Sequence, residues 1–315
     1  MISRIKYILK KKKQEFILLI KNIFKEVELM KLSGKEKHIM YLKKMLCHPY
    51  LILKKIINKE LNITYVEMVL TTRCTLNCKG CSALMNYYDK RNDINIDVNI
   101  KSLQRLLNCC NSINHLRLLG GEPLLYSKLL ELLLFLNKQE KIKRITIVTN
   151  GTLLIKDDKI IEILKNNTFD VFISNYGNNS SRKDELIKQL KINNIKYELG
   201  SEDKLWRDYG NLDKRNRSKK ELRKQFLNCN IMCTSILNGN IHHCPRSSHG
   251  TNIKKIPLRK QDYIYLLDEN INERQLKKEL YRFFNRYTPY IEACDYCNYA
   301  TNELKMIPAG EQYKK

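Results

Sequence analysis

The chain has 315 residues, of which 43% are hydrophobic, so it is long enough for one large domain with a real core, with or without an appendage. Its formal net charge is +25, but apart from the run at 10–13 the lysines are spread along the chain rather than gathered in one stripe. We therefore interpret the charge as compositional bias, and we do not expect a nucleic-acid-binding protein.

The N-terminal stretch 1–24 has no apolar run long enough for a secretory signal or a membrane span. Eleven cysteines in such a chain indicate a reducing compartment, where clustered cysteines bind metal more often than they form disulfides. We expect a cytoplasmic protein. Three cysteines outside the clusters, Cys47, Cys109 and Cys110, are predicted to be buried packing thiols.

Residues 1–60 are lysine-rich, and their apolar positions follow a helical period. Two interpretations remain open for this extension. It is either a helix packed on the outside of the main domain or a basic helix that lies on a membrane surface or a partner.

From residue 61 onward, strands and helices alternate at intervals of about 30 residues, which favours βα units and a parallel sheet. The predicted strands lie at 65–70, 115–123, 144–151, 170–177 and 195–200, and the predicted helices at 96–110, 129–139, 158–166 and 183–193. Five such units that close on themselves form an incomplete (βα) TIM-like barrel, which we assign to residues 61–225 of an α/β protein. In such barrels the chemistry lies on the loops that follow the strands.

The pattern changes after residue 200. Residues 202–221 are polar and predict loop and helix, and residues 226–315 form a small C-terminal domain with a second group of cysteines. Within it, residues 234–244 predict a β-hairpin with Asn238 and Gly239 at the turn, and His242 and His243 at its surface. The stretch LWRDYG at 205–210 is either a wall of the substrate pocket or a packed loop, and Arg246 is a candidate for binding an anionic substrate.

The sequence TTRCTLNCKGCSAL at 71–84 places Cys74, Cys78 and Cys81 within eight residues at the end of the first predicted strand. Three thiols can hold three irons of a cubane cluster and leave the fourth iron open to a small chelating molecule. A zinc loop and a redox dithiol are the alternatives.

This loop resembles the signature of the radical S-adenosylmethionine (SAM) enzymes, and Gly120, Gly121, Glu122 and Pro123 match their Gly-Gly-Glu-Pro turn after the second strand. The resemblance covers roughly residues 61–200. It implies a SAM-binding [4Fe-4S] cluster that cleaves SAM reductively to a 5′-deoxyadenosyl radical. The glycines would let the backbone approach the SAM amino group, and the carboxylate of Glu122 would accept a hydrogen bond from it.

Two weaker matches implied by the same resemblance are Asn150, in a Thr-Asn-Gly loop, and Ser174, at the end of the fourth strand; both are predicted to contact the cofactor. One position departs from the family. The residue before the third cysteine is often aromatic and lies against the adenine, but here it is Gly80, so another side chain must cover that surface.

The second group resembles the SPASM/twitch auxiliary-cluster domains, in which cysteines flank a hairpin. Cys244, Cys294 and Cys297 are the firm ligands of a second [4Fe-4S] cluster, and Cys229 and Cys233 compete for the fourth place. No cysteine follows Cys297, as in the shortened single-cluster version. A zinc ribbon is the alternative.

The resemblance implies an oxidoreductase that abstracts a hydrogen from a small sugar-like or nucleotide-linked substrate, with the auxiliary cluster as electron acceptor. The alternative is a maturase that modifies a peptide or protein. Either enzyme would need a reductant such as flavodoxin or ferredoxin. The sequence identifies no general acid or base.

Overall fold

The computed structural model describes residues 60–202, 204–230 and 233–313, and the stretch Leu61–Lys315 forms one compact unit. The predicted N-terminal helix and Cys47 lie outside the described residues. Within the described ranges, no helix is both long enough and apolar enough to cross a membrane.

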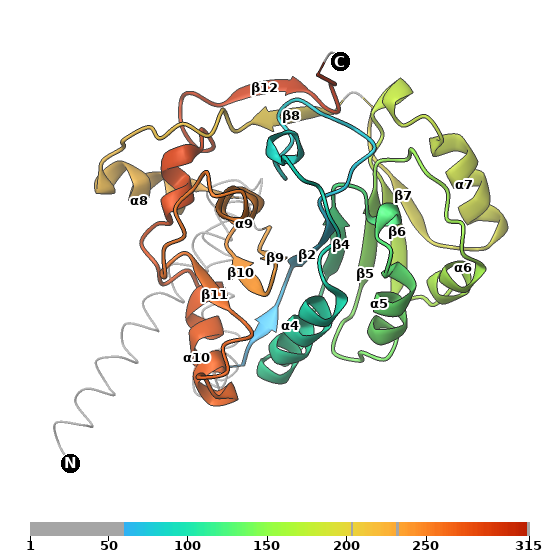
Figure 1. Cartoon of the computed structure of the whole chain (residues 1–315), viewed down its shortest axis with the longest axis horizontal. Helices are drawn as coiled ribbons and strands as arrows, with labels where there is room; N and C mark the ends of the chain where they lie inside the picture. The colour runs from blue at the N-terminus through green and yellow to red at the C-terminus, as the bar shows by residue number, and fades with distance from the viewer. Residues whose placement is uncertain (1–59, 203, 231–232, 314–315) are drawn as a thin grey trace, which may run out of the picture. The chain divides into compact units, whose positions relative to one another are not determined.

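An eight-stranded sheet in the order β11-β10-β9-β2-β4-β5-β6-β7 organises the unit (Figure 1). The five strands β2, β4, β5, β6 and β7 run parallel to their neighbours in chain order, as the alternating pattern predicts. Their bounds are β2 (Val66–Thr71), β4 (Leu116–Gly120), β5 (Ile145–Thr149), β6 (Phe169–Ile173) and β7 (Tyr197–Leu199). The fold is therefore α/β with a sheet that is mostly parallel.

Four helices alternate with these strands and cover one side of the sheet (Figure 1). They are α4 (Ile96–Cys109), α5 (Leu129–Leu136), α6 (Asp158–Leu164) and α7 (Lys183–Ile192), each within a few residues of its prediction. The side chain of Asn95 caps α4 and that of Asp157 caps α6 by accepting backbone N–H bonds. All six residues of β2 are buried, because this central strand is covered on both faces.

The predicted hairpin is confirmed as β9 (Ser235–Leu237) and β10 (Asn240–His242). Asn238 and Gly239 both have positive φ, of 49° and 79°, as a two-residue hairpin turn requires. β9 pairs in parallel with β2, and β10 pairs antiparallel with β11 (Tyr263–Tyr265). The strands after the predicted boundary at 225/226 thus extend the sheet of the preceding region.

Three further helices surround the hairpin: α8 (Lys219–Asn228), α9 (Pro245–Asn252) and α10 (Glu273–Phe284). A capping box between Ser218 and Glu221 fixes the start of α8. Leu276 and Leu280 of α10 are fully buried in the same core as the parallel strands. Buried thiols at Cys109 and Cys110 belong to that core too, as predicted.

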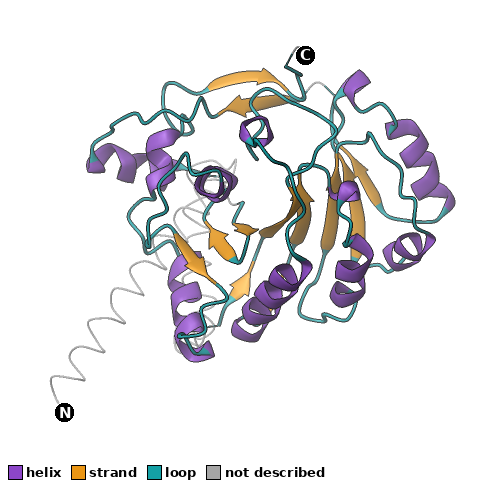
Figure 2. Ribbon diagram, in the orientation of Figure 1, coloured by secondary structure: helices purple, strands orange, loops and turns teal. Residues whose placement is uncertain are grey.

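The remaining elements are short (Figure 2). β8 (Leu205–Asp208) pairs antiparallel with β12 (Lys305–Pro308), and β1 (Asn62–Ile63) pairs in parallel with β3 (Ser112–Ile113). The described residues also contain the 3-10 turns η1 (Met85–Tyr87), η2 (Pro123–Leu125), η3 (Gly177–Asn179) and η4 (Glu292–Tyr296). The β8 strand lies in the polar stretch for which the sequence predicts only loop and helix.

Candidate active site

Both cysteine groups line one cavity of about 250 Å³. It lies at the carboxyl ends of β2, β4, β5 and β6, where the loops of a parallel sheet carry chemistry. The predicted site residues that line it are Cys74, Cys78, Cys81, Gly120, Gly121, Asn150, Ser174, Cys229, Cys233, Cys244, Cys294 and Cys297. Two predicted residues, Glu122 and Pro123, are buried beneath the wall and are not part of the lining.

The Gly-Gly turn is packed against the backbone of the first cysteine loop. A Cβ atom at Gly120 would lie 2.2 Å from the carbonyl oxygen of Thr71, and one at Gly121 would lie 2.1 Å from that of Arg73. The Gly121 amide donates to the Thr71 carbonyl at 2.8 Å, and the Glu122 amide donates to the Arg73 carbonyl at 2.8 Å. Close approach to this loop therefore requires both glycines, independently of any approach to a ligand.

The carboxylate of Glu122 is not part of the cavity lining, and the expectation that it accepts a hydrogen bond from a bound amino group stays a prediction. Its side chain is fully buried; one oxygen accepts from the Leu124 amide at 3.1 Å and the other from the Asn150 amide at 2.8 Å. Burial raises the pKa of Glu122 to about 7, although these backbone hydrogen bonds oppose the rise. Glu122 thereby joins the Gly-Gly turn to the Thr-Asn-Gly loop.

Amide donors point at the sulfurs of the first group. The backbone amide of Leu76 donates to Cys74 Sγ at 3.5 Å, and the side-chain amide of Gln312 donates to Cys78 Sγ at 3.0 Å. Burial raises the pKa of Cys81, while hydrogen bonds from backbone amides of the turn that follows it act in the opposite direction. N–H donors of this kind fit thiolate sulfurs that carry a cluster's negative charge.

Asn150 and Ser174 reach the same region from β5 and β6. The Asn150 side-chain amide donates to Thr75 Oγ1 at 3.0 Å and lies 3.7 Å from Cys74 Sγ, within hydrogen-bonding range of a sulfur. The Ser174 hydroxyl hydrogen-bonds the side chain of Tyr176, and both residues line the cavity. The structure thus brings the two weaker sequence matches to the cysteine loop.

Gly80 is covered by β12. Its φ is +61°, and a Cβ atom there would lie 2.3 Å from Cδ1 of Ile307. The cross-strand neighbour of Ile307 is Trp206 of β8, which lines the cavity and packs edge-on against Tyr176 at 5.3 Å between ring centroids. An aliphatic and aromatic surface therefore lies beside Gly80, where the sequence predicts that another side chain takes the place of an aromatic residue.

The two candidates for the fourth place in the second group have different surroundings. Burial, together with the neighbouring thiols of Cys229 and Cys297, raises the pKa of Cys244 to about 12. Burial also raises the pKa of Cys294, and the thiols of Cys244, Cys297 and Cys229 act in the same direction. For Cys233, burial raises the pKa to about 12, and the next contributions come from the charge of Glu67 and a hydrogen bond to it.

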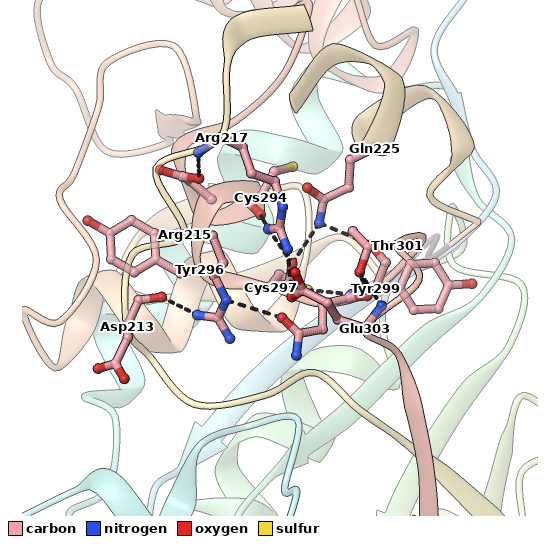
Figure 3. A network of polar contacts seen from close by, with 12 residues as sticks. Asp213, Arg215, Arg217, Gln225, Cys294, Tyr296, Cys297, Tyr299, Thr301 and Glu303 are labelled. Atoms are coloured by element: carbon pink, nitrogen blue, oxygen red, sulfur yellow. Dashed lines mark hydrogen bonds and ion pairs between the residues drawn. The ribbon is translucent and has the colours of Figure 1, made fainter. Parts of the chain in front are cut away.

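A dense network of polar contacts fixes the Cys294–Cys297 turn (Figure 3). The guanidinium of Arg217 donates to the carbonyl oxygens of Cys294 and Cys297 at 3.2 and 2.9 Å. The side-chain amide of Gln225 donates to the carbonyls of Cys297 and Tyr299 at 2.7 and 3.0 Å. These contacts join residues 217–225, at and before α8, to residues 294–299, at and after η4.

The charge around the second group is positive. Arg246 is buried and donates to the carbonyl of Tyr296 at 2.6 Å, and its charge lowers the pKa of Cys297 against the effect of burial. Arg215 acts on Cys297 in the same direction, and Arg286 donates to the Cys229 carbonyl at 3.0 Å. Four thiolates around a [4Fe-4S] core leave a net negative charge, so the donor set and this cationic surrounding fit such a cluster.

For this region, the predicted exposure of two histidines is wrong, and a predicted position of the LWRDYG stretch is confirmed. His242 and His243 are buried, 2% and 6% exposed, instead of lying on the hairpin surface. They are buried because His243 stacks on Phe283 of α10 and His242 Nδ1 pairs with Ser247 Oγ of α9. Burial lowers the pKa of each imidazole to about 3. Trp206 of the LWRDYG stretch lies in the cavity wall, as one of its two interpretations proposed.

Sequence analysis did not identify two residues of this site, Glu67 and Gln312. Glu67 projects from β2 into the lining, accepts from the Tyr65 hydroxyl at 2.6 Å, and has a pKa raised by burial. Gln312 reaches Cys78 from the opposite end of the chain. A single Glu in the otherwise apolar run of β2 gives a signal for Glu67, but nothing local signals Gln312. Among the residues that the structure describes, all cysteines are free thiols, and no three His, Cys, Asp or Glu side chains converge as one bound metal ion would require.

The central part of the chain is similar to known proteins. Residues 68–175 match the model described as "Radical SAM superfamily". A GTP 3′,8-cyclase of Clostridium acetobutylicum is 32% identical over 146 residues, which cover 42% of this chain and 45% of that protein. A GTP 3′,8-cyclase of Clostridium perfringens is 34% identical over 116 residues, which cover 36% of this chain and 34% of the other. The chain thus spans less than half the length of these relatives.

Solved structures are similar at a lower level. BtrN in complex with AdoMet and 2-DOIA superposes with a TM-score of 0.42 at 15% identity, over 81% of this chain and 98% of that one. Streptococcus suis SuiB bound to S-adenosylmethionine gives a TM-score of 0.38 at 20% identity, over 62% and 44% of the two chains.

Proposed function

We propose that the protein is an enzyme that binds a [4Fe-4S] cluster through Cys74, Cys78 and Cys81 and cleaves SAM, because residues 68–175 match the radical SAM superfamily model. When bound, the cluster would supply the electron that splits SAM into methionine and a 5′-deoxyadenosyl radical, which abstracts a hydrogen atom from the substrate. The observation that carries the proposal is the three-thiol loop, which ends a buried strand, lines the cavity and is fixed by the Gly-Gly turn.

The neighbouring residues would position the cofactor and keep water out. Asn150 and Ser174 present polar side chains at the sheet edge beside the loop, where a ribose or an amino-acid group needs hydrogen-bond partners. Trp206, with Ile307 behind it, would cover the adenine in place of the missing aromatic residue before Cys81. Glu122 would act indirectly, because its buried carboxylate holds the Asn150 backbone.

A second [4Fe-4S] cluster would be held by Cys229, Cys244, Cys294 and Cys297 in an incomplete-barrel enzyme with a SPASM/twitch-like segment at 226–315. Support comes from the effect of Cys229 on the pKa of Cys244, Cys294 and Cys297, and from the arginines that surround this group. Cys233, whose thiol is hydrogen-bonded to Glu67, would remain a free cavity thiol.

We propose a small, nucleotide-linked or sugar-like substrate. The relatives in Clostridium are named for a reaction of GTP, and the buried cation of Arg246 in the cavity wall suits an anionic group. If the reaction is an oxidation, the second cluster would accept the electron and Glu67, the buried carboxylate of the lining, would accept the proton. A cyclisation like that named for the relatives is the second candidate, and a peptide maturase the third.

The test uses the full chain, reconstituted anaerobically with iron and sulfide and given SAM with a strong reductant. We expect 5′-deoxyadenosine from the wild type and none from the variant in which Cys74, Cys78 and Cys81 are all alanine. That variant should still retain about four irons per chain, those of the second cluster. Wild-type protein that holds iron but forms no 5′-deoxyadenosine would refute the proposal, and zinc in place of iron at the second group would assign that group to a zinc ribbon.

A further inference from the structure

The segment Ala309–Tyr313 lies along the first cysteine loop. The Lys79 amide donates to the Glu311 carbonyl at 2.6 Å, and the Tyr313 amide donates to the Asn77 carbonyl at 3.0 Å. Between these two bonds, Cys78 and Gln312 form an isolated antiparallel bridge. Residues more than 230 positions apart in sequence thus pair as two short strands directly at a predicted cluster ligand.

The side chain of Gln312 occupies one fixed orientation in this pairing. Its Oε1 accepts from the backbone amide of Asn77 at 2.7 Å, and its Nε2 donates to the carbonyl of Gly310 at 2.6 Å and to Cys78 Sγ at 3.0 Å. A flipped amide would set N–H against N–H and C=O against C=O, so the chemistry of the neighbours assigns the two ends. The N–H group that faces the sulfur is therefore a donor.

The segment is held in place from its other side as well. Gly310 has φ of +73°, and a Cβ atom there would lie 2.5 Å from the ring of Tyr176. The side-chain amide of Asn179 donates to the Gly310 carbonyl at 3.1 Å. The preceding strand, β12, is paired along its length with β8. The segment that carries Gln312 is thus held beside Cys78 by its own contacts with the rest of the protein.

We propose that Gln312 is a positioning residue of the SAM-cleaving site: it orients Cys78 and donates a hydrogen bond to the sulfur that binds the cluster. This inference rests on the proposed function, because it needs a cluster at Cys74, Cys78 and Cys81. Hydrogen bonds to ligand sulfurs are one of the levers that set a cluster's reduction potential. The reduced cluster is more negative than the oxidised one, so the Gln312 donor stabilises the reduced state and raises the potential.

Two substitutions remove the donor in different ways. Gln312→Glu keeps the length and the oxygen that accepts from Asn77, but it replaces the N–H donor with a carboxylate oxygen. Gln312→Met is neutral and of similar length, and it has no donor. The matched control is Glu311→Gln, which removes the neighbouring ion pair of Glu311 with Lys79. Both side chains of that pair are about 40% exposed, so its loss should cost little.

The experiment is a redox titration of the reconstituted full chain, followed by the EPR signal that changes when SAM is added. We expect a more negative midpoint potential in Gln312→Met, a larger shift in the same direction in Gln312→Glu, and no shift in Glu311→Gln. Wild-type potentials in both Gln312 variants would overturn the inference. A wild-type protein without any SAM-responsive signal would instead overturn the proposed function, so the two failures are distinguishable.

A second measurement covers variants that do not retain the cluster. In the metal-free protein, alkylation of individual cysteines is followed by mass spectrometry, with circular dichroism to confirm the fold. Folded Gln312→Met should be alkylated faster at Cys78 than wild type is, with no change at Cys109, which is buried in the core. An unchanged rate at Cys78 would show that Gln312 does not position this thiol.

Discussion

Replacement of Gly121 by alanine tests whether the Gly-Gly turn supports the cysteine loop. The added Cβ would lie 2.1 Å from the carbonyl oxygen of Arg73, 2.5 Å from its carbonyl carbon and 2.8 Å from Cβ of Cys74. Ordinary contacts between carbon atoms are about 3.5–4.0 Å, so the loop backbone has to move by about 1 Å or more. Since the obstacle is backbone and not the end of a flexible side chain, relaxation is poor.

Overpacking of this kind costs about 1–3 kcal/mol, and we expect a value at or above the upper end. The corresponding loss in Tm is at least about 5 °C, which thermal denaturation of the metal-free protein can measure. Because the displaced atoms carry Cys74, the variant should also bind less iron at the first site than wild type does.

Gly200, which follows β7 in the same sheet, provides the matched control. A Cβ atom there would have its nearest neighbours at 3.4 Å, an ordinary contact distance. Gly200→Ala should therefore change stability by less than about 1 kcal/mol and leave iron binding unchanged. If Gly121→Ala behaved like Gly200→Ala in both assays, the support of the cysteine loop by the Gly-Gly turn would be refuted.

Three further predictions concern ligands, pH and packing. Cys229→Ala should lose about four irons per chain and Cys233→Ala none, as measured by iron analysis after reconstitution; the reverse pattern would exchange their roles. The pKa of Glu122 rises from 4.5 unfolded to about 7 folded, so its stabilising contribution is complete below pH 4.5 and is lost as the pH rises through 7. The stability of the metal-free wild type relative to Glu122→Gln should fall by up to about 3 kcal/mol across that window in urea denaturation, and a flat difference would contradict the burial argument. Gly80→Ala should be destabilising because its Cβ meets Ile307, and Ile307→Ala should recover part of that loss in a double-mutant cycle; strict additivity would show no contact.

Local patterns were sufficient for the parallel strands and their helices. The run YVEMVL predicts β2 because it is apolar and ends at the cysteine loop, and the Asn238-Gly239 pair predicts the hairpin because both residues tolerate positive φ. The cysteine spacing likewise points to the loop that lines the cavity. In each case the determining interactions lie within a few residues of one another.

Features that depend on distant partners could not be predicted. β8 is exposed at alternate positions and gains its partner only from β12, about 100 residues later. The histidines of the hairpin end look like surface residues until α9 and α10 cover them. The pairing of Gln312 with Cys78 depends on the path of the whole chain, and so does the contact between Cys233 and Glu67 of β2.

The Gly-Gly-Glu-Pro turn has a structural role that the match to a cofactor-binding motif does not indicate. From sequence, Gly120, Gly121 and Glu122 were expected to contact a bound amino group. In the structure the backbone of the cysteine loop also requires the glycines, and the Glu122 carboxylate accepts from two backbone amides. Contact with a bound amino group stays a prediction. A sequence motif at an active site can therefore serve the loops that carry the ligands as well as the ligand itself.

The central claim is that one cavity holds a SAM-binding cluster and a second, fully ligated cluster. The most direct measurement is the EPR spectrum of the reduced, reconstituted protein with and without SAM. The account predicts two cluster signals, of which one changes on addition of SAM and is missing from the variant with alanine at Cys74, Cys78 and Cys81. A spectrum that does not respond to SAM, or a responsive signal that survives this substitution, would contradict it.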